Sequence, residues 1–113
     1  MLCRLTNRGM TVLAPAKLNL FLRVVARRPD GYHEIESVMA AINIYDTLTF
    51  EETSSEGVEL TVVDASPRSA VPGLRSEAPA GPTNLVVRAA MLLKEYAGCR
   101  RGAKIFLIKR IPS

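Results

Sequence analysis

The chain has 113 residues and 48% hydrophobic residues, so it is long enough for one domain with a core. Its apolar runs are shorter than the roughly 18 residues of a membrane span, and two cysteines are too few for a disulfide framework or a clustered zinc site. The net charge of +4 permits phosphate ligands, but the basic residues are scattered in ones and twos and do not indicate nucleic acid.

The first predicted element is a strand. Residues 1–10 show no hydrophobic period, so we expect a flexible extension over 1–9 and a domain over 10–113. From Val12 to Arg28 the side chains alternate with period two, which is typical of a strand. Lys17 and Asn19 are two residues apart, so they project from one face. The apolar residues around them predict burial on both faces of this strand: Leu18, Leu20, Phe21 and Leu22.

A turn follows at Pro29, Asp30 and Gly31, because proline presets φ and glycine supplies a left-handed position. Tyr32 and His33 come directly after this turn. One interpretation is a turn-flanking aromatic residue beside a partly exposed histidine. The other is a clamp for a nucleobase, in which the tyrosine ring stacks on the base for roughly 1–3 kcal/mol and the histidine reads its polar edge.

The middle of the chain contains further strand candidates. Residues 35–44 are ambiguous between strand and helix by period alone, whereas 46–52 alternate as a strand does. Residues 58–63 predict another strand, paired with the preceding one through the polar turn at 53–57. The Pro-, Ser-, Gly- and Ala-rich residues 64–82 predict a long surface loop.

The clearest helix covers 84–97, with Thr83 or Asn84 as its cap and Gly98 as its stop. A last strand is predicted over 103–112. These elements indicate an α+β fold, in which a mostly antiparallel sheet carries a helix on one face.

Three polar residues have explanations that need no ligand. Lys17 fits a solvated sheet face, Asn84 fits a helix cap and Lys109 fits a solvated strand residue. The residues by themselves leave both the structural and the functional interpretations open.

Four stretches of the chain carry a resemblance: APAKLNLFLRVVARRPDGYHEIES, YDTLTFE, TNLVVRAAMLL and IFLIKRIP. They resemble the amino-terminal part of the 4-diphosphocytidyl-2-C-methyl-D-erythritol kinase family, within the GHMP kinase superfamily. The combination of PAKLNL and DGYHE is specific to this family, whereas LIKRIP indicates only the superfamily. The resemblance implies the amino-terminal lobe of a GHMP kinase, similar to the second domain of a small-subunit ribosomal protein.

The resemblance also implies three groups of site residues. Lys17 would be the catalytic residue, a cation beside the reacting hydroxyl, and Asn19 would help to hold the substrate. Tyr32 and His33 would clasp the cytosine of the cytidine diphosphate group. The positions beside the adenine of ATP would be Asn84, Leu85 and Lys109.

The activity implied by this resemblance is ATP-dependent phosphorylation of the 2-hydroxyl of 4-diphosphocytidyl-2-C-methyl-D-erythritol, a step of non-mevalonate isoprenoid biosynthesis. ATP and Mg²⁺ would be the cofactors, and the partners would be small molecules, without nucleic acid or membrane. The cysteine usage and the lack of a signal-peptide pattern predict a cytoplasmic protein.

The sequence departs from the family where its last strand ends. In the family this strand continues into a Gly/Ser-rich loop that holds the ATP phosphates, and a catalytic aspartate lies further on. Because the sequence stops before both, we expect an amino-terminal fragment without activity of its own. Two alternatives are another small-molecule GHMP kinase and a non-catalytic basic module that binds RNA.

Overall fold

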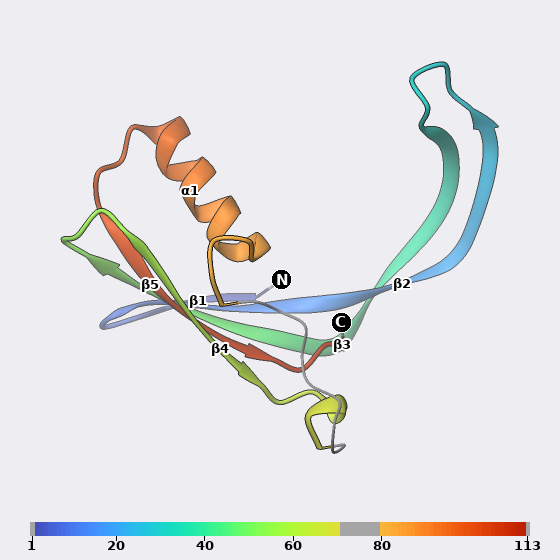
Figure 1. The fold of residues 1–113 in the computed structure, drawn as a ribbon. Helices are drawn as coiled ribbons and strands as arrows, with labels where there is room; N and C mark the ends of the chain where they lie inside the picture. The colour runs from blue at the N-terminus through green and yellow to red at the C-terminus, as the bar shows by residue number, and fades with distance from the viewer. Residues whose placement is uncertain (1, 71–79, 113) are drawn as a thin grey trace.

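The computed structural model describes residues 2–70 and 80–112 (Figure 1). One sheet has the strand order β1-β2-β3-β5-β4, and helix α1 lies over one of its faces. Three of the four strand pairings are antiparallel, and β4 with β5 is parallel, which confirms the predicted α+β fold. The elements are β1 (Leu2–Thr6), β2 (Gly9–Arg27), β3 (His33–Thr53), β4 (Val58–Asp64), the 3₁₀ helix η1 (Pro67–Ala70), α1 (Leu85–Ala97) and β5 (Gly102–Lys109).

The strands β2 and β3 form one long hairpin, so the ambiguous residues 35–44 are strand. The pairing of β1 with β2 ends at Leu13 and that of β5 with β3 at Thr47. Beyond these points the hairpin continues by itself as an arm, which we define as residues 17–41. The pairing of β2 with β3 shifts at three places, and such bulges bend a hairpin, in keeping with the curved arm of Figure 1.

The predicted burial on both faces of β2 is wrong. In the arm, the exposed fraction is 67% for Leu20, 47% for Phe21 and 59% for Val24. The reason is that only β2 and β3 pair there, while α1 lies over the other part of the sheet. The buried apolar residues instead belong to α1 and β5.

The predicted pairing of β4 with the strand before it is also wrong. The strand β5 lies between β3 and β4, antiparallel to the first and parallel to the second. Parallel neighbours need a crossover connection, and α1 provides it. At the start of β5, a Cβ on Gly102 would overlap the carbonyl oxygens of Ser55 and Gly57, so glycine lets β5 enter between the two strands.

The helix α1 has the ends that the sequence predicts. Asn84 is the N-cap, since its Oδ1 accepts a hydrogen bond from the amide of Val86 at 2.8 Å. Gly98 ends the helix in the left-handed conformation with φ of 63°. Of the predicted loop at 64–82, residues 71–79 lie outside the described residues. Within 2–70 and 80–112, no helix combines the length and the apolar composition that crossing a membrane requires.

The expected extension at residues 1–9 contains β1, which pairs antiparallel with β2 at one edge of the sheet. All five residues of β1 are exposed, which explains why the sequence shows no alternation of apolar and polar residues there. A turn joins the two strands, and the Gly9 amide donates to Thr6 Oγ1 at 3.1 Å. That residues 1–9 are dispensable stays a prediction.

Candidate functional site

Tyr32 and His33 lie at the tip of the arm, after the predicted turn. Gly31 has a φ of 88°, and the Tyr32 amide donates to Asp30 Oδ1 at 3.0 Å. The Arg28 guanidinium and the Asp30 carboxylate form an ion pair at 2.8 Å across the same turn. Tyr32 is 74% exposed, so this turn presents the aromatic ring to solvent, where a planar ligand can stack on it.

Lys17 and Asn19 lie on one face of the arm, opposite residues of β3. Ser37 Oγ donates to Asn19 Oδ1 at 3.3 Å, so this contact does not use the Nδ2 group of the Asn19 amide. Lys17 Nζ lies 3.8 Å from the sulfur of Met39. Among the ion pairs of the described residues, none includes Lys17, and a thioether cannot neutralise an ammonium.

The structure does not bring the tip and the middle of the arm together. His33 pairs with Arg27, which is ten residues beyond Lys17 on β2, or roughly 33 Å along the strand at 3.3 Å per residue. The curvature of the arm makes the straight separation shorter than this contour. A ligand that touches both places must therefore reach from the tip of the arm to its middle.

The other three predicted residues lie at the opposite region, where β5 ends and α1 begins. Asn84 is 8% exposed and serves as the helix cap, whereas the next residue, Leu85, is 73% exposed. The side chain of Lys109 is only 14% exposed and forms an ion pair with Asp46 at 3.3 Å. The interpretation of Lys109 as a solvated strand residue is therefore wrong.

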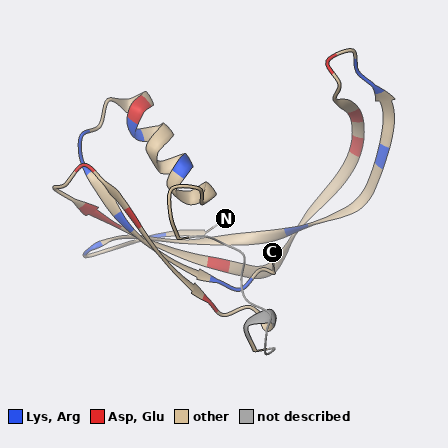
Figure 2. Cartoon of the chain, in the orientation of Figure 1, with Lys and Arg blue, Asp and Glu red and all other residues tan. Residues whose placement is uncertain are grey.

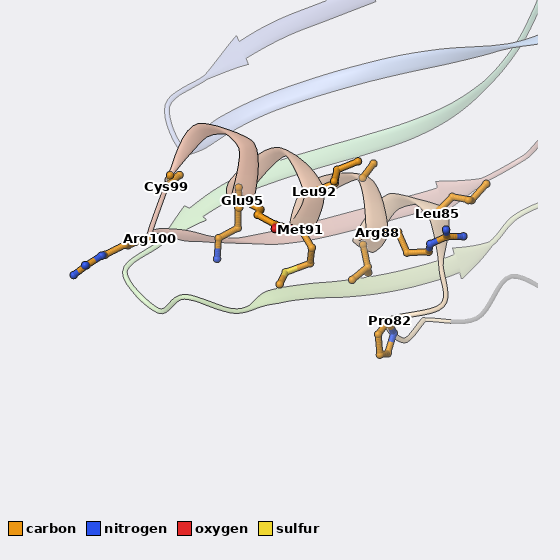
Figure 3. A pocket seen from close by; sticks show the side chains of 12 residues that line it. Pro82, Leu85, Arg88, Met91, Leu92, Glu95, Cys99 and Arg100 are labelled. Carbon is orange, nitrogen blue, oxygen red and sulfur yellow. The ribbon is translucent and has the colours of Figure 1, made fainter.

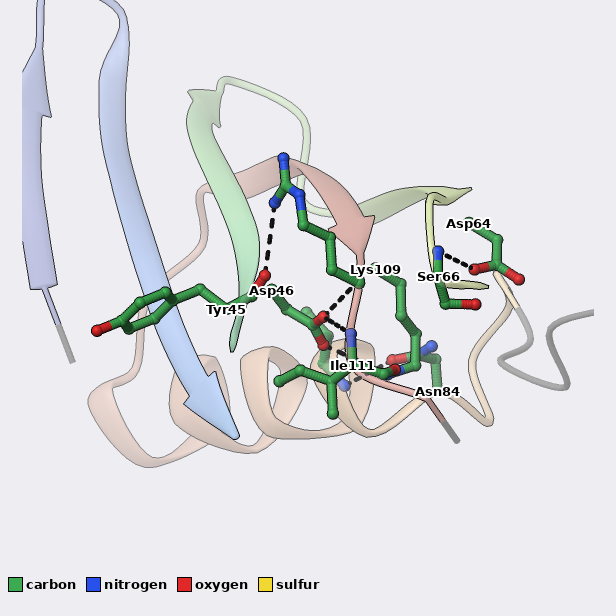
Figure 4. Close-up of polar contacts among 9 residues, drawn as sticks. Tyr45, Asp46, Asp64, Ser66, Asn84, Lys109 and Ile111 are labelled. Carbon is green, nitrogen blue, oxygen red and sulfur yellow. Dashed lines mark hydrogen bonds and ion pairs between the residues drawn. The ribbon is translucent and has the colours of Figure 1, made fainter. Parts of the chain in front are cut away.

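Asp46 is the residue of this region that sequence reasoning missed. Its Oδ1 accepts from the amides of Arg110 and Ile111 at 2.7 and 2.8 Å, and its Oδ2 contacts Lys109 Nζ (Figure 4). The sequence contained one indication of this role, because Asp46 directly precedes the alternating run TLTFE, which predicts a strand with one buried face. A carboxylate in that position needs partners, but the sequence did not show that they lie more than 60 residues away.

Two hollows adjoin α1. The first has a volume of about 900 Å³ along the outer side of the helix, and Leu85, Arg88, Leu92 and Glu95 line part of it (Figure 3). The second has about 680 Å³ and a mostly apolar lining from both α1 and the sheet, including Leu93 and Ile105. The second hollow shows that α1 is loosely packed on the sheet over part of its length.

Charged residues do not form a single basic surface. On the two strands of the arm, the basic residues belong to β2 and the acidic residues to β3, and the rest of the sheet carries both signs of charge (Figure 2). In 2–70 and 80–112, no three acidic, histidine or cysteine side chains gather as a metal site would require.

No model of a protein family matches the chain. A 4-diphosphocytidyl-2-C-methyl-D-erythritol kinase from Pelotomaculum thermopropionicum is 45% identical over 103 residues, which are 91% of this chain and 32% of that protein. The enzyme of the same name from Methylococcus capsulatus is 43% identical over 99 residues, 88% of this chain and 30% of that protein.

A crystal structure of 4-(cytidine 5'-diphospho)-2C-methyl-D-erythritol kinase has a similar fold. The TM-score is 0.68 with 39% sequence identity, over 92% of this chain and 32% of that one. The chain thus spans about a third of the length of the curated relatives that it matches.

Proposed function

We infer that the chain belongs to the 4-diphosphocytidyl-2-C-methyl-D-erythritol kinase family and is part of an enzyme that phosphorylates the 2-hydroxyl of that substrate with ATP. The observation that carries this inference is the similarity, at 45% identity, over 91% of the chain. The related crystal structure supports it, because the shared fold covers 92% of the chain. The whole enzyme would act in the non-mevalonate formation of isoprenoid precursors.

In this proposal the arm binds the cytidine substrate. The exposed ring of Tyr32 stacks on the cytosine and His33 reads its polar edge. The diphosphate and the methylerythritol then follow the arm toward Lys17, which accounts for the separation between the two places.

Lys17 and Asn19 act where the phosphoryl group is accepted. Phosphoryl transfer depends mainly on positioning and on stabilising charge. Lys17 has no carboxylate partner in the described part of the chain, so its charge is available to orient the hydroxyl and stabilise developing negative charge. Asn19, held by Ser37, donates through Nδ2 to an oxygen of the substrate.

The nucleotide would lie at the other region, near Asn84 and Leu85, with Mg²⁺ arriving on the ATP phosphates. The partners in this proposal are small molecules in the cytoplasm, without nucleic acid or membrane. The scattered charges support this choice over the RNA-binding alternative, because RNA affinity arises from several neighbouring phosphate contacts.

The test uses a protein that contains the complete kinase sequence. It is incubated with ATP, Mg²⁺ and 4-diphosphocytidyl-2-C-methyl-D-erythritol, and ADP release is followed together with the new phosphate monoester by ³¹P NMR. We expect turnover of this substrate and none of homoserine or mevalonate. Turnover of either competitor alone would identify a different GHMP kinase, and filter binding of RNA with a steep salt dependence would favour the non-catalytic module.

A further inference from the structure

One carboxylate fixes the backbone where the chain leaves β5. Asp46 Oδ1 accepts from two successive amides, those of Arg110 and Ile111, at 2.7 and 2.8 Å. Two amides on one carboxylate oxygen determine both the position and the direction of this backbone. Asp46 belongs to β3, so the contact ties the end of β5 to a neighbouring strand.

The ammonium of Lys109 is committed to the same place. Its Nζ lies 3.3 Å from Asp46 Oδ2 and donates to the carbonyl of Ile111 at 2.7 Å. An ammonium has three N–H donors, so these contacts use two of them. The side chains of Lys109 and Asp46 are 14% and 15% exposed, which leaves little of either charge open to an incoming ligand.

An anion that approached Lys109 would also meet Asp46. The pair carries no net charge, so a phosphate that reached the remaining N–H of the ammonium would be repelled by the Asp46 carboxylate and would gain little electrostatic attraction. Removing one partner of a largely buried ion pair destabilises the folded protein, because the other charge is left uncompensated. These contacts therefore fix the backbone at residues 110 and 111.

We propose that Asp46 and Lys109 are a positioning pair that sets the course of residues 109–111, and that Lys109 does not contact the nucleotide. This inference rests on the proposed function, and it changes the role that the resemblance implies for Lys109, which is a place beside the adenine of ATP. It assigns ATP binding in this region to neighbouring groups such as Asn84 and Leu85. The effect of Lys109 on ATP is then indirect, through the backbone that it holds.

The first arm of the test measures positioning in the 113-residue chain. Hydrogen exchange of the Arg110 and Ile111 amides is followed by NMR in the wild type, in Asp46→Ala and in Asp46→Asn, which keeps an acceptor oxygen if the alanine variant does not fold. We expect exchange to become at least about tenfold faster in Asp46→Ala and less so in Asp46→Asn. Unchanged exchange in the folded variants would overturn the proposal.

The matched control breaks an exposed ion pair. Arg101 and Glu52 lie 2.7 Å apart with side chains 71% and 63% exposed, and the hydrogen bond that Arg101 donates to the Glu52 carboxylate raises the pKa of Arg101. In Glu52→Gln we expect the exchange of both reporter amides to stay as in the wild type. A change as large as that in the Asp46 variants would mean that the effect is not specific to the buried pair.

The second arm asks whether Lys109 touches ATP, in the complete kinase. Asp46→Asn and Lys109→Met should each raise the KM for ATP several-fold, and the double variant should return it to within about threefold of the wild type, because no buried charge is left unpaired. If Lys109 contacted ATP, the double variant would remain as impaired as Lys109→Met. If the wild type turned over no substrate, the proposed function would fail, and the exchange experiment would still decide the positioning role.

Discussion

Lys17 and Asn19 have different kinds of partner across the hairpin. Lys17 lies beside the uncharged sulfur of Met39, so this neighbour does not offset its charge. Asn19 accepts from the hydroxyl of Ser37, which orients the amide. The two residues therefore place a charge without a carboxylate partner, among the described residues, beside an oriented amide, which is the arrangement that the proposed function uses.

Replacing Tyr32 and replacing Lys17 in the complete kinase should affect different kinetic constants, the KM for the cytidine substrate and kcat. Tyr32→Ala removes a stacking surface worth about 1–3 kcal/mol, so it should raise the KM for the cytidine substrate roughly tenfold. Lys17→Ala should chiefly lower kcat, because its charge matters most in the transition state. Steady-state kinetics with the cytidine substrate varied is the measurement. An unchanged KM in Tyr32→Ala would contradict the nucleobase clamp.

Ser37 should affect activity by orienting the side-chain amide of Asn19. In Ser37→Ala that amide loses its orienting hydroxyl, and we expect kcat/KM for the cytidine substrate to fall several-fold, since such a hydrogen bond contributes about 1 kcal/mol. Ser37→Thr keeps the hydroxyl and should retain most of the activity. If the threonine variant were as poor as the alanine variant, the role of the hydroxyl would be refuted.

At the scale of elements, the sequence predicts features that depend on residues close together in the chain. It does not predict features that depend on distant residues. The ends of α1 were predictable because Asn84 and Gly98 act within a few residues of themselves. The neighbours of β4 were not, because the intervening strand begins only at Gly102. The resemblance supplied Lys17 and Tyr32, but no rule of sequence spacing links Asp46 to residues over 60 positions away.

The cap of α1 should contribute measurably to stability. Replacing Asn84 by alanine removes the acceptor for the Val86 amide, and we expect the free energy of unfolding to fall by about 1 kcal/mol. Asn84→Asp keeps an acceptor and should lose less. Urea unfolding followed by circular dichroism tests both variants. Equal stability of the wild type and the alanine variant would show that the cap adds nothing.

The edge strand β1 should be dispensable. Among the described residues 2–9, the deletion of residues 1–9 removes no buried side chain, so the free energy of unfolding should change by less than about 1 kcal/mol. The measurement is thermal or urea unfolding of the chain beginning at Met10. A larger loss would mean that β1 is an integral part of the sheet.

The whole molecule has much apolar surface outside its core. In 2–70 and 80–112, the buried apolar residues are Val87, Ile105 and Leu107, whereas both faces of the arm carry exposed leucine, valine and isoleucine. The loose contact between α1 and the sheet adds to this surface. Apolar patches of this kind promote association.

The 113-residue chain should therefore self-associate. Sedimentation velocity should show species larger than a monomer at micromolar concentration. Replacing Leu20, which is 67% exposed on the arm, by aspartate should reduce the association. A monodisperse monomer of the wild type would contradict this expectation.

The position of β5 also constrains the order in which the sheet is completed. This strand is synthesised after β3 and β4 but lies between them, and its pairing joins Thr47 to Ile108. A nascent chain can form the β2–β3 hairpin early, because its strands are adjacent in sequence. The strand β4 has no neighbour to pair with until β5 has been synthesised. Of these five strands, the one that leaves the ribosome last is thus the one that joins the two parts of the sheet.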